Sequence, residues 1–312
     1  MSDEKRMNSI SHLALKHAVW LCAMLGCLTG RADVIFDRIS AYNHIQVIDE
    51  GDTRRLSFNG SWETRMSLVF PLTGHFEYTE YFQMPWIWNT NIHRVLMAGL
   101  GGGSTQRAYQ HYYTNVLVDT VEIDPVVVSV AQQYFHVTET PQLRIHTNDA
   151  RMFLLRSTNT YDVILMDAYS TTRYGSSLPA HLTTREFFTI ANARLSTNGV
   201  LAYNVIGQIQ GYRASVVGAI YRTMKQVFPQ VYLFPASESE NVVLIGTKSN
   251  EYFDLARVQA DAVLLMRSGR VTLRTFYVRT ANFIAQPPPS ANQSPILTDD
   301  YAPIESLLQG SQ

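Results

Sequence analysis

The feature that most constrains this chain is a regular alternation of apolar, strand-like runs with helix-like segments from Arg94 onward. Strand-like runs such as "RVLMAGL", "NVLVDTVEI" and "YDVILMD" alternate with segments such as "STQRAYQHYY" and "PVVVSVAQQYF". Parallel neighbouring strands need a long crossover connection, and a helix usually supplies it. The pattern therefore predicts an α/β fold with a doubly wound, mostly parallel, Rossmann-like sheet. Two later runs, "VYLFPA" and "NVVLIGTKS", predict an antiparallel pair that closes the series.

The segment before this alternation has a different pattern and predicts a separate small domain. Short alternating runs between Gly and Asp turns, such as "HIQVIDE" and "RRLSFNG", are typical of a small antiparallel sheet. "HFEYTEYFQMPWIW" then predicts an amphipathic helix whose aromatics are mostly core. We therefore expect an N-terminal β-sheet domain with a linking helix at 33–90 and a nucleoside-binding α/β domain at 91–312. Within the latter, "DLARVQADAVLLMRSG" predicts a helix and "AQPPPSANQSP" a surface loop.

The first 32 residues differ from the rest because they contain an apolar, uncharged run from Ala18 to Gly30. A run of about 13 residues is shorter than the roughly 20 that a membrane-spanning helix needs. With Lys16 before it and small residues near Ala32, it fits the apolar region of a secretory signal peptide. Residues 1–32 are therefore predicted to direct export to the periplasm, with transient membrane contact through this segment. A short helix packed on a cytoplasmic protein is the alternative interpretation.

Composition argues against several classes of function. Both cysteines, Cys22 and Cys27, lie in the N-terminal segment, so its removal would leave no disulfide, thiol nucleophile or Cys-based metal site. The nine histidines do not fall into a metal-ligand spacing such as HExxH, and we predict no metal. The 312 residues carry a formal net charge of -1 without a run of Lys or Arg, which argues against nucleic-acid binding.

A glycine-rich turn follows the first predicted parallel strand. In "VLMAGLGGGSTQ", four glycines allow a tight turn and a close approach of the backbone to a ligand. The helix expected to begin at Ser104 would present free N–H groups beside them. Against the dinucleotide pattern G-x-G-x-x-G, Gly99 and Gly101 fit, but Ser104 takes the third place. The turn alone indicates a nucleotide site without identifying the nucleotide.

Two acids at the ends of the next strands strengthen this interpretation. Glu122 ends the second strand, about twenty residues after the glycines, where an acid can accept both ribose hydroxyls. Asp149 follows the third strand, where it can accept a hydrogen bond from an adenine amino group. A solvated strand-end acid is the alternative for Glu122 alone, but three such strand ends together predict a nucleoside site. NAD and S-adenosylmethionine share the first two features, and similarity to known families favours the latter because of Asp149 and the antiparallel pair.

The chain resembles the spermidine synthase (polyamine aminopropyltransferase) family, in a spermidine synthase-like bacterial branch, from residue 34 to residue 308. The resemblance is carried by "SAYNHIQVIDE", "FNGSWE", "EYTEYF", "VLMAGLGGGS", "VEIDPVVVSVAQQYF", "NDARMFL", "YDVILMDAY", "HLTTREFF" and "LTDDYAPIESLL". It implies a β-sheet domain before a methyltransferase-like α/β domain. It also implies transfer of an aminopropyl group to a putrescine-like polyamine acceptor, with release of methylthioadenosine. The donor is decarboxylated S-adenosylmethionine, which is a co-substrate and not a tightly bound cofactor. Members commonly form dimers or tetramers through the N-terminal sheet, so a homodimer is expected.

The resemblance also implies roles for individual residues. On the nucleoside side, Glu122 would hold the ribose, and Asp149 and Ala150 would hold the adenine. The nucleoside with its sulfonium-bearing chain would be held by the Gly-rich turn, namely Gly99, Gly101, Gly102 and Gly103. Asn43 matches a Gln that flanks the nucleotide. On the amine side, Tyr78 matches a Tyr of the amine pocket, and Asp167 matches the first acid of the family's D-S-S-D-P loop.

The chain departs from the family pattern at the amine side. The second loop acid, the family's expected general base, falls on Ser170. Where many members carry an acid inside the Gly-rich turn, this chain has Gly102, and where they carry a neutral Gln, this chain has Glu63. A His or Gln after the helix Tyr falls on Thr79, and the loop 167–182 is longer than the common form. Because a buried ammonium needs a partner, we expect an altered amine acceptor, with Glu63 adding one acid back.

The identity of the general base stays open from the sequence. The reaction is attack of a neutral amine on the carbon beside a sulfonium, but an alkylamine has a pKa near ~10.4 and is mostly protonated at neutral pH. A carboxylate can attract the ammonium and take its proton, whereas Ser170 cannot do so alone. Asp167, Glu63, His181 and Tyr169 remain as candidates. We place Tyr169 and Ser170 where the amine would pass.

Two of these candidates have plain structural alternatives. Asp167 could be a strand-end acid that only binds loop amides. His181 has an intrinsic pKa suited to proton transfer, but a surface position that caps a helix beginning at Leu182 is the stronger interpretation.

Two other functions compete with aminopropyl transfer. The protein could be a methyltransferase that uses intact S-adenosylmethionine, because without an acid at Gly102 the site is less committed to an aminopropyl amine. It could also be a non-catalytic nucleoside-binding paralogue, because Ser170 replaces the usual base and export would separate the protein from a cytosolic co-substrate.

Overall fold

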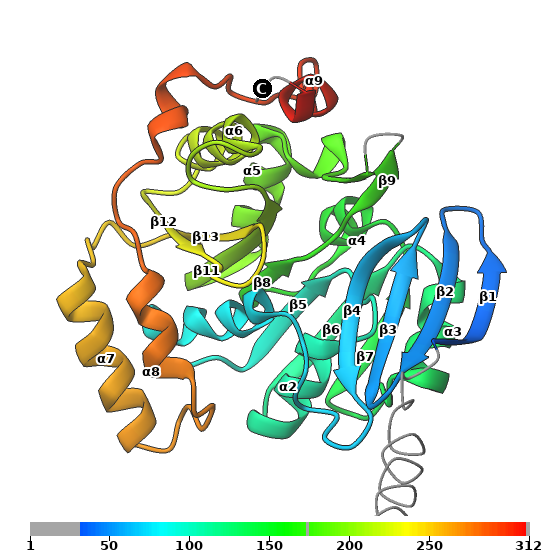
Figure 1. Ribbon diagram of the computed structural model, residues 1–312. Coiled ribbons are helices and arrows are strands. Elements are labelled where there is room, and N and C mark those ends of the chain that lie inside the picture. The colour runs from blue at the N-terminus through cyan, green and yellow to red at the C-terminus, as the bar shows by residue number, and fades with distance from the viewer. Residues whose placement is uncertain (1–31, 173–174, 310–312) are drawn as a thin grey trace, which may run out of the picture.

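The N-terminal part of the molecule is a four-stranded antiparallel meander. The computed structural model describes residues 32–172 and 175–309. Its first four strands are β1 (Asp33–Ile39), β2 (His44–Glu50), β3 (Thr53–Phe58) and β4 (Ser61–Ser67), paired in chain order. The small antiparallel sheet expected from the sequence is therefore confirmed. One face of it, with Ile45, Val47, Leu56 and Met66, packs on helix α3 (Pro125–Tyr134), beside which the blue sheet lies in Figure 1.

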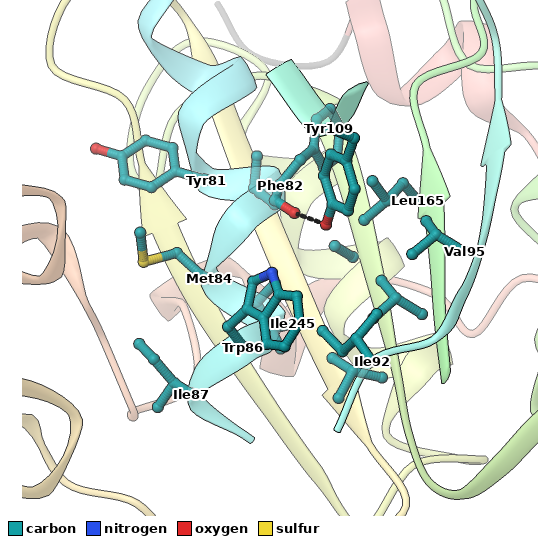
Figure 2. Packing of buried hydrophobic residues seen from close by; sticks show 14 of the residues in the cluster. Tyr81, Phe82, Met84, Trp86, Ile87, Ile92, Val95, Tyr109, Leu165 and Ile245 are labelled. Carbon is teal, nitrogen blue, oxygen red and sulfur yellow. Dashed lines mark hydrogen bonds between the residues drawn. The ribbon is translucent and has the colours of Figure 1, made fainter. Parts of the chain in front are cut away.

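The segment after this sheet is η1, a 3₁₀ helix from Glu77 to Ile87, so a helix is found where one was predicted, but the prediction that it is amphipathic is wrong. Nearly every side of η1 is buried, so it has no solvated polar face, and Pro85 inside it has no N–H to donate. Figure 2 shows its side chains packed against Val95 and Leu165 of the central sheet. The Tyr109 hydroxyl of α2 (Ser104–Tyr112) donates to the Phe82 carbonyl at 2.9 Å and ties η1 to that helix.

The central sheet has seven strands in the order β12-β13-β11-β8-β5-β6-β7. They are β5 (Arg94–Ala98), β6 (Leu117–Glu122), β7 (Leu143–Thr147), β8 (Tyr161–Met166), β11 (Leu195–Ile206), β12 (Gln230–Pro235) and β13 (Asn241–Thr247). β5 to β8 and β11 run parallel, while β13 is antiparallel to both β11 and β12. The predicted mostly parallel sheet with a closing antiparallel pair is confirmed. The chain leaves β5 in one direction for β6 and β7 and returns on its other side as β8, so a ligand crevice is expected at the β5/β8 switch point.

Helices cover both faces of this sheet, because the side chains of its strands alternate between the two faces and are apolar on both. Val95 and Met97 face a core shared with η1, α2 and α7 (Leu255–Arg267). Leu96 and Ala98 face a second core, built with α4 (Ala150–Arg156), α5 (Arg185–Arg194) and α6 (Ala214–Met224). Alternate residues of one strand point to opposite faces, so β5 is buried on both sides. Figure 1 shows α7 with the short α8 (Phe276–Arg279) on one side and α5 and α6 on the other.

Two segments expected to be irregular contain regular structure. The long loop after β8 includes a small hairpin, β9 (Ser170–Thr172) with β10 (Gly175–Ser177), and a turn of 3₁₀ helix, η2 (Ala180–Leu182). The Pro-rich segment is only partly a surface loop, because it contains η4 (Pro289–Gln293) packed on α6. The Ser290 hydroxyl donates to the Ala214 carbonyl at 2.7 Å and so ties η4 to the first turn of α6. The last helix is α9 (Ile304–Gln309).

The predicted signal peptide lies almost entirely outside the described residues. Within residues 32–172 and 175–309, no helix is long and apolar enough to cross a bilayer.

Candidate active site

A cavity of about 260 Å³ opens at the carboxyl ends of β5, β6 and β8, at the switch point of the sheet. The N-terminal sheet, η1 and the loop after β8 close its other sides. Most of the residues proposed from the sequence line it, namely Asn43, Glu63, Tyr78, Gly99, Gly101, Glu122, Asp149, Ala150, Asp167, Tyr169, Ser170 and His181. The structure therefore brings the nucleoside-side and amine-side candidates into one space. Gly102 and Gly103 are the exceptions, because they do not line the cavity.

The Gly-rich turn approaches the loop after β8 so closely that one of its positions requires glycine. Gly99 has a φ of +95°, and a Cβ there would lie 2.2 Å from the carbonyl oxygen of Asp167. α2 begins after Gly103 without a side-chain cap, and Ser104 and Thr105 in its first turn line the cavity. Backbone N–H groups at such a helix start favour an electron-rich ligand group.

Gly102 points away from the cavity, toward the N-terminal sheet. Its N–H donates to the Thr64 hydroxyl at 2.9 Å. A Cβ at Gly102 would lie 2.7 Å from Thr64 Cγ2 and 2.9 Å from the ring of Phe135. The buried Arg107 guanidinium donates to the carbonyl oxygens of Gly102 and Phe135 and fixes the turn from behind. The position of the missing family acid is thus filled by packing between the two sheets.

Glu122 ends β6 with its carboxylate held by the backbone on both sides. One oxygen accepts from the Leu100 N–H at 3.0 Å and the other from the Asp124 N–H at 2.9 Å. Burial raises the pKa of Glu122, against these hydrogen bonds, which lower it. Each carboxylate oxygen can accept a second hydrogen bond, so the group remains able to bind the two hydroxyls of a ribose.

Asp149 has two partners in the structure. It caps α4, because its Oδ1 accepts from the Met152 N–H at 2.8 Å. Its Oδ2 lies 2.8 Å from His181 Nε2 at the end of the long loop. The prediction that His181 caps the following helix is wrong, since the Thr184 hydroxyl caps α5 by accepting from the Phe187 N–H. His181 instead joins the loop to the acid of the predicted adenine side.

Asp167 lies at the end of β8 and is bonded by two side chains. Asn204 Nδ2 of β11 donates to one carboxylate oxygen at 2.9 Å, and the Tyr78 hydroxyl of η1 donates to the other at 3.2 Å. Burial raises the pKa of Asp167 to about 6, against these two hydrogen bonds. No hydrogen bond from a loop amide to this carboxylate is found among the described residues, where its two partners are side chains. A carboxylate with this pKa exchanges a proton close to neutral pH.

Tyr169 and Ser170 follow Asp167 along the cavity wall. The Tyr169 hydroxyl donates to the Asn204 carbonyl at 2.9 Å, and burial raises the pKa of Tyr169 well above its ordinary value. It is therefore a poor base and instead anchors the start of the loop to β11. Ser170 is exposed, and its hydroxyl donates to the Ser177 carbonyl across the hairpin at 3.4 Å.

Glu63 and Asn43 enter the cavity from the N-terminal sheet. Glu63 Oε1 accepts from the Ser176 hydroxyl of β10 at 3.0 Å. Burial raises the pKa of Glu63, and the negative charge of Asp167 raises it further, while hydrogen bonds from Ser176 and Ser61 oppose the rise. Asn43 lies between β1 and β2, where its Oδ1 accepts from Asn59 Nδ2 at 2.9 Å.

Three residues of the site were missed from the sequence. Asn204 is 1% exposed and binds Asp167, and a polar residue within the apolar run "GVLAYNVI" was a signal for it. Thr64 and Ser176 act through contacts between elements far apart in the chain, which no local pattern shows. Among the described residues, no group of three or more His, Cys, Asp or Glu side chains is arranged to hold a metal ion.

Comparison with known proteins places these features in one family. A family model described as the spermine/spermidine synthase domain matches residues 75–246, more than half of the chain. The chain belongs to the spermine/spermidine synthase family. A polyamine aminopropyltransferase from Vibrio vulnificus is 30% identical, with 96% of this chain and 99% of the relative aligned. A probable polyamine aminopropyl transferase from Bifidobacterium longum is 28% identical over 90% of this chain and 64% of that protein.

Solved structures show the same fold in this family and in methyltransferases. Spermidine synthase from Thermotoga maritima superposes with a TM-score of 0.65 at 21% identity, covering 81% of this chain and 84% of that one. Human methyltransferase-like protein 13, solved in complex with SAH, gives a TM-score of 0.54 at 23% identity, covering 62% and 90% of the two chains. At these identities the likeness concerns the fold, and the family assignment rests on the sequence matches.

Proposed function

We propose that this member of the spermine/spermidine synthase family transfers an aminopropyl group from decarboxylated S-adenosylmethionine to an amine acceptor. The observation that carries the proposal is the position of Asp167, a buried carboxylate in the same cavity as the Gly99 turn and Glu122. A nucleoside held at the strand ends would direct its sulfonium-bearing chain toward this acid. The full-length similarity to an aminopropyltransferase from Vibrio vulnificus supports the same reaction.

On the nucleoside side, we assign the ribose to Glu122 and the adenine to Asp149 and Ala150. Gly99, Gly101 and the first turn of α2 lie where the chain beyond the ribose would pass, and Asn43 flanks the nucleoside from the N-terminal sheet. Gly102 and Gly103 support the turn from outside the cavity. The nucleoside is a co-substrate that leaves as methylthioadenosine.

On the amine side, Asp167 attracts the ammonium form of the acceptor and takes its proton. The freed nitrogen lone pair attacks the carbon beside the sulfonium, the carbon–sulfur bond breaks, and its electron pair goes to sulfur. The positive charge of the sulfonium passes to the nitrogen of the new carbon–nitrogen bond as neutral methylthioadenosine forms, and the transferred proton rests on Asp167. Tyr78 and Asn204 keep the carboxylate in place by donating one hydrogen bond to each oxygen. Ser170, although it lies in the loop, carries no group that can accept this proton at neutral pH.

The test is release of methylthioadenosine by the purified protein, given decarboxylated S-adenosylmethionine and a panel of amines. We expect release that depends on the amine. No release with any amine would overturn the transferase proposal. Release of S-adenosylhomocysteine from intact S-adenosylmethionine would instead support a methyltransferase, and calorimetry with the two nucleosides would show which one the site prefers. The methyltransferase relative from Emericella nidulans, 35% identical, aligns with only 50% of this chain, so aminopropyl transfer is the better supported function.

Two further proposals rest on the sequence and the family. We propose that residues 1–32 are an export signal, which mass spectrometry of the mature N-terminus tests directly. An unprocessed N-terminus in the purified native protein would contradict it.

We also propose a homodimer through the N-terminal sheet, as the family resemblance implies. Light scattering of the purified protein measures the molecular mass that decides between a monomer and a dimer.

A further inference from the structure

Three polar side chains form a row across one end of the central sheet. Asp167 directly follows β8, Asn204 lies in β11, and Asn241 is the first residue of β13. These strands are neighbours in the order β13-β11-β8, as Figure 1 also shows. Asn204 pairs with Val243 of the antiparallel strand β13, so Asn241, two residues before Val243, lies on the same face of the sheet. The row therefore joins the proposed base to the antiparallel end of the sheet.

Two hydrogen bonds connect the row. Asn204 Nδ2 donates to Asp167 Oδ1 at 2.9 Å, and Asn241 Nδ2 donates to Asn204 Oδ1 at 3.1 Å. Asn204 is almost completely buried, so its amide oxygen needs a donor from the protein. Asn241 supplies that donor. It does not line the active-site cavity and reaches Asp167 only through Asn204.

The partners of Asn204 decide which end of its amide faces Asp167. The oxygen and the NH₂ group of an Asn amide have nearly the same shape, so hydrogen bonds alone fix its orientation. An ionised carboxylate only accepts hydrogen bonds and therefore binds the NH₂ group. A protonated carboxyl can donate, so it would bind equally well to the oxygen if Asn204 rotated. Asn241 opposes this rotation, because the NH₂ groups of Asn204 and Asn241 would then face each other.

The other groups around Asp167 do not replace this contribution. The titratable side chains that face it are Glu63 of β4, Tyr78 of η1 and Tyr169 of the loop. None of the ion pairs formed among residues 32–172 and 175–309 includes Asp167. Burial raises the pKa of Asp167, and the hydrogen bonds from Asn204 and Tyr78 lower it. The ionised form therefore depends on these two neutral donors.

The far end of the row opens into a second cavity. Asn241 lines this space of about 550 Å³, which lies between the segments 207–210 and 235–242. Its carboxylates are Glu238 and Glu240, and both are exposed. The second cavity makes Asn241 accessible to substitution without a change in the walls of the active site.

We propose that Asn241 is a positioning residue, which fixes the orientation of Asn204 and so keeps Asp167 able to accept a proton near neutral pH. This inference rests on the proposed transferase function, in which Asp167 takes the proton of the amine. It adds a residue of the antiparallel end of the sheet to the machinery of that step. Asn241 itself touches no reacting atom.

The first experiment measures the pH dependence of kcat/KM for methylthioadenosine release in the wild type, Asn241→Leu and Asn241→Asp. Leu and Asp are close to Asn in shape. Leu removes the donor, so Asn204 can rotate when Asp167 is protonated, and the acidic limb should move up by about half a pH unit. Asp also adds an acceptor that binds the NH₂ group of Asn204, and the limb should move up by about one unit or more. At about pH 8.5, where Asp167 is ionised in all three proteins, kcat/KM should agree within about threefold.

The matched control is Gln208→Glu, which also adds a carboxylate to the second cavity. Gln208 is exposed, and its side chain has no hydrogen bond to Asn204 among the described residues. Solvent screens such a charge, so the limb should move by less than about 0.2 units. A shift as large as that of Asn241→Asp would show that added charge is the cause and overturn the proposal. An unmoved limb in both Asn241 variants, or an equal loss at every pH, would also overturn it.

Failure of this inference can be told from failure of the proposed function. If the wild type releases no methylthioadenosine with any amine, the transferase proposal is wrong. NMR titration of the Asp167 carboxyl carbon in ¹³C-labelled protein, identified by its absence in Asp167→Asn, still tests Asn241 alone. A midpoint higher in Asn241→Asp than in the wild type and Gln208→Glu would support the positioning role. Equal midpoints in the three proteins would refute it.

Discussion

The nucleoside side and the amine side of the cavity are built in different ways. Glu122 and Asp149 lie at the ends of successive strands of the central sheet, and backbone N–H groups of the adjoining turns and helix start hold both carboxylates. Glu63 and Asp167 come from different sheets, and each is held by side chains from elements far apart in the chain. The nucleoside side is therefore a local product of strand ends, whereas the amine side exists only once the whole molecule has assembled.

This difference predicts what substitutions on each side will do. Backbone partners stay when one side chain is changed, so a substitution on the nucleoside side should mainly weaken ligand affinity. A substitution within a network of side chains removes several contacts together. Asp167, the group proposed to exchange the proton, lies within such a network. Substitutions on the amine side should therefore change turnover or acceptor choice more than nucleoside binding.

The largest effect is expected for Asp167→Asn. Removing a general base typically costs 10²- to 10⁴-fold, so we expect kcat to fall about a thousandfold while the Kd for methylthioadenosine changes less than about threefold. Steady-state kinetics and calorimetry measure the two quantities. Asp52→Asn, in an exposed turn of the N-terminal sheet, is the control. A kcat within a few fold of the wild type would mean that Asp167 is not the proton acceptor.

On the nucleoside side, Glu122→Gln should act through binding. The amide keeps one acceptor oxygen but loses the charge, and a charged hydrogen bond contributes about 1.5–3 kcal/mol, so the Kd for methylthioadenosine should rise about tenfold to hundredfold. At saturating nucleoside, kcat should stay close to that of the wild type. Glu305→Gln on α9, an exposed residue outside the cavity, serves as the control. A large fall in kcat at saturation would remove the distinction between the two sides.

The pH profile tests the amine side separately from the nucleoside side, because the raised pKa of Asp167 belongs to the amine side. The pKa of about 6 lies above the ordinary value of 3.8, so the carboxyl is neutral below about pH 6 and cannot accept a proton. We expect kcat/KM to fall about tenfold per pH unit below that point, with methylthioadenosine binding nearly constant from pH 7 to pH 5. The amine titrates near ~10.4, so its protonation gives a constant slope over this range and cannot produce a break near pH 6.

A control separates Asp167 from the second acid with a raised pKa, Glu63. The Glu63→Gln variant assayed with butylamine should keep the same acidic limb. An acidic limb near pH 4 in the wild type would show that Asp167 titrates in its ordinary range and is not the buried base described above.

The nucleoside side of the site could be predicted from the sequence more completely than the amine side. Gly99, Glu122 and Asp149 were found because strand-end positions follow directly from the alternation of strands and helices. The partners of Asp167 and Glu63 were not found, because Asn204 and Ser176 reach them only through pairing and packing of separate elements.

In the fold, too, the features that depend on packing between separate elements could not be predicted from local sequence patterns. The alternation of strands and helices and the antiparallel end of the sheet followed from pattern, but η1 was predicted as an amphipathic helix. A helix is present there, but it is a 3₁₀ helix that contains Pro85 and is buried on nearly every side. The role of His181 was misjudged because Thr184, three residues later, is the better cap for α5.

The smallest effect is expected for His181→Ala, which tests the boundary between the two sides. His181 links the loop of the amine side to Asp149 of the nucleoside side at 2.8 Å, but its side chain is 48% exposed. Asp149 also keeps its bond to the Met152 N–H, so it should remain in place without the imidazole. An exposed pair of this kind contributes about 0.2–1 kcal/mol, and we expect the Kd for methylthioadenosine to rise only about twofold.

Calorimetry of His181→Ala beside His111→Ala, a matched change on the outer side of α2, measures this difference. A weakening beyond about tenfold could not come from one exposed hydrogen bond. It would mean that the loop, and not the end of β7 with the backbone of α4, positions Asp149. The nucleoside side would then depend on long-range assembly as the amine side does, and the loop after β8 would govern both substrates.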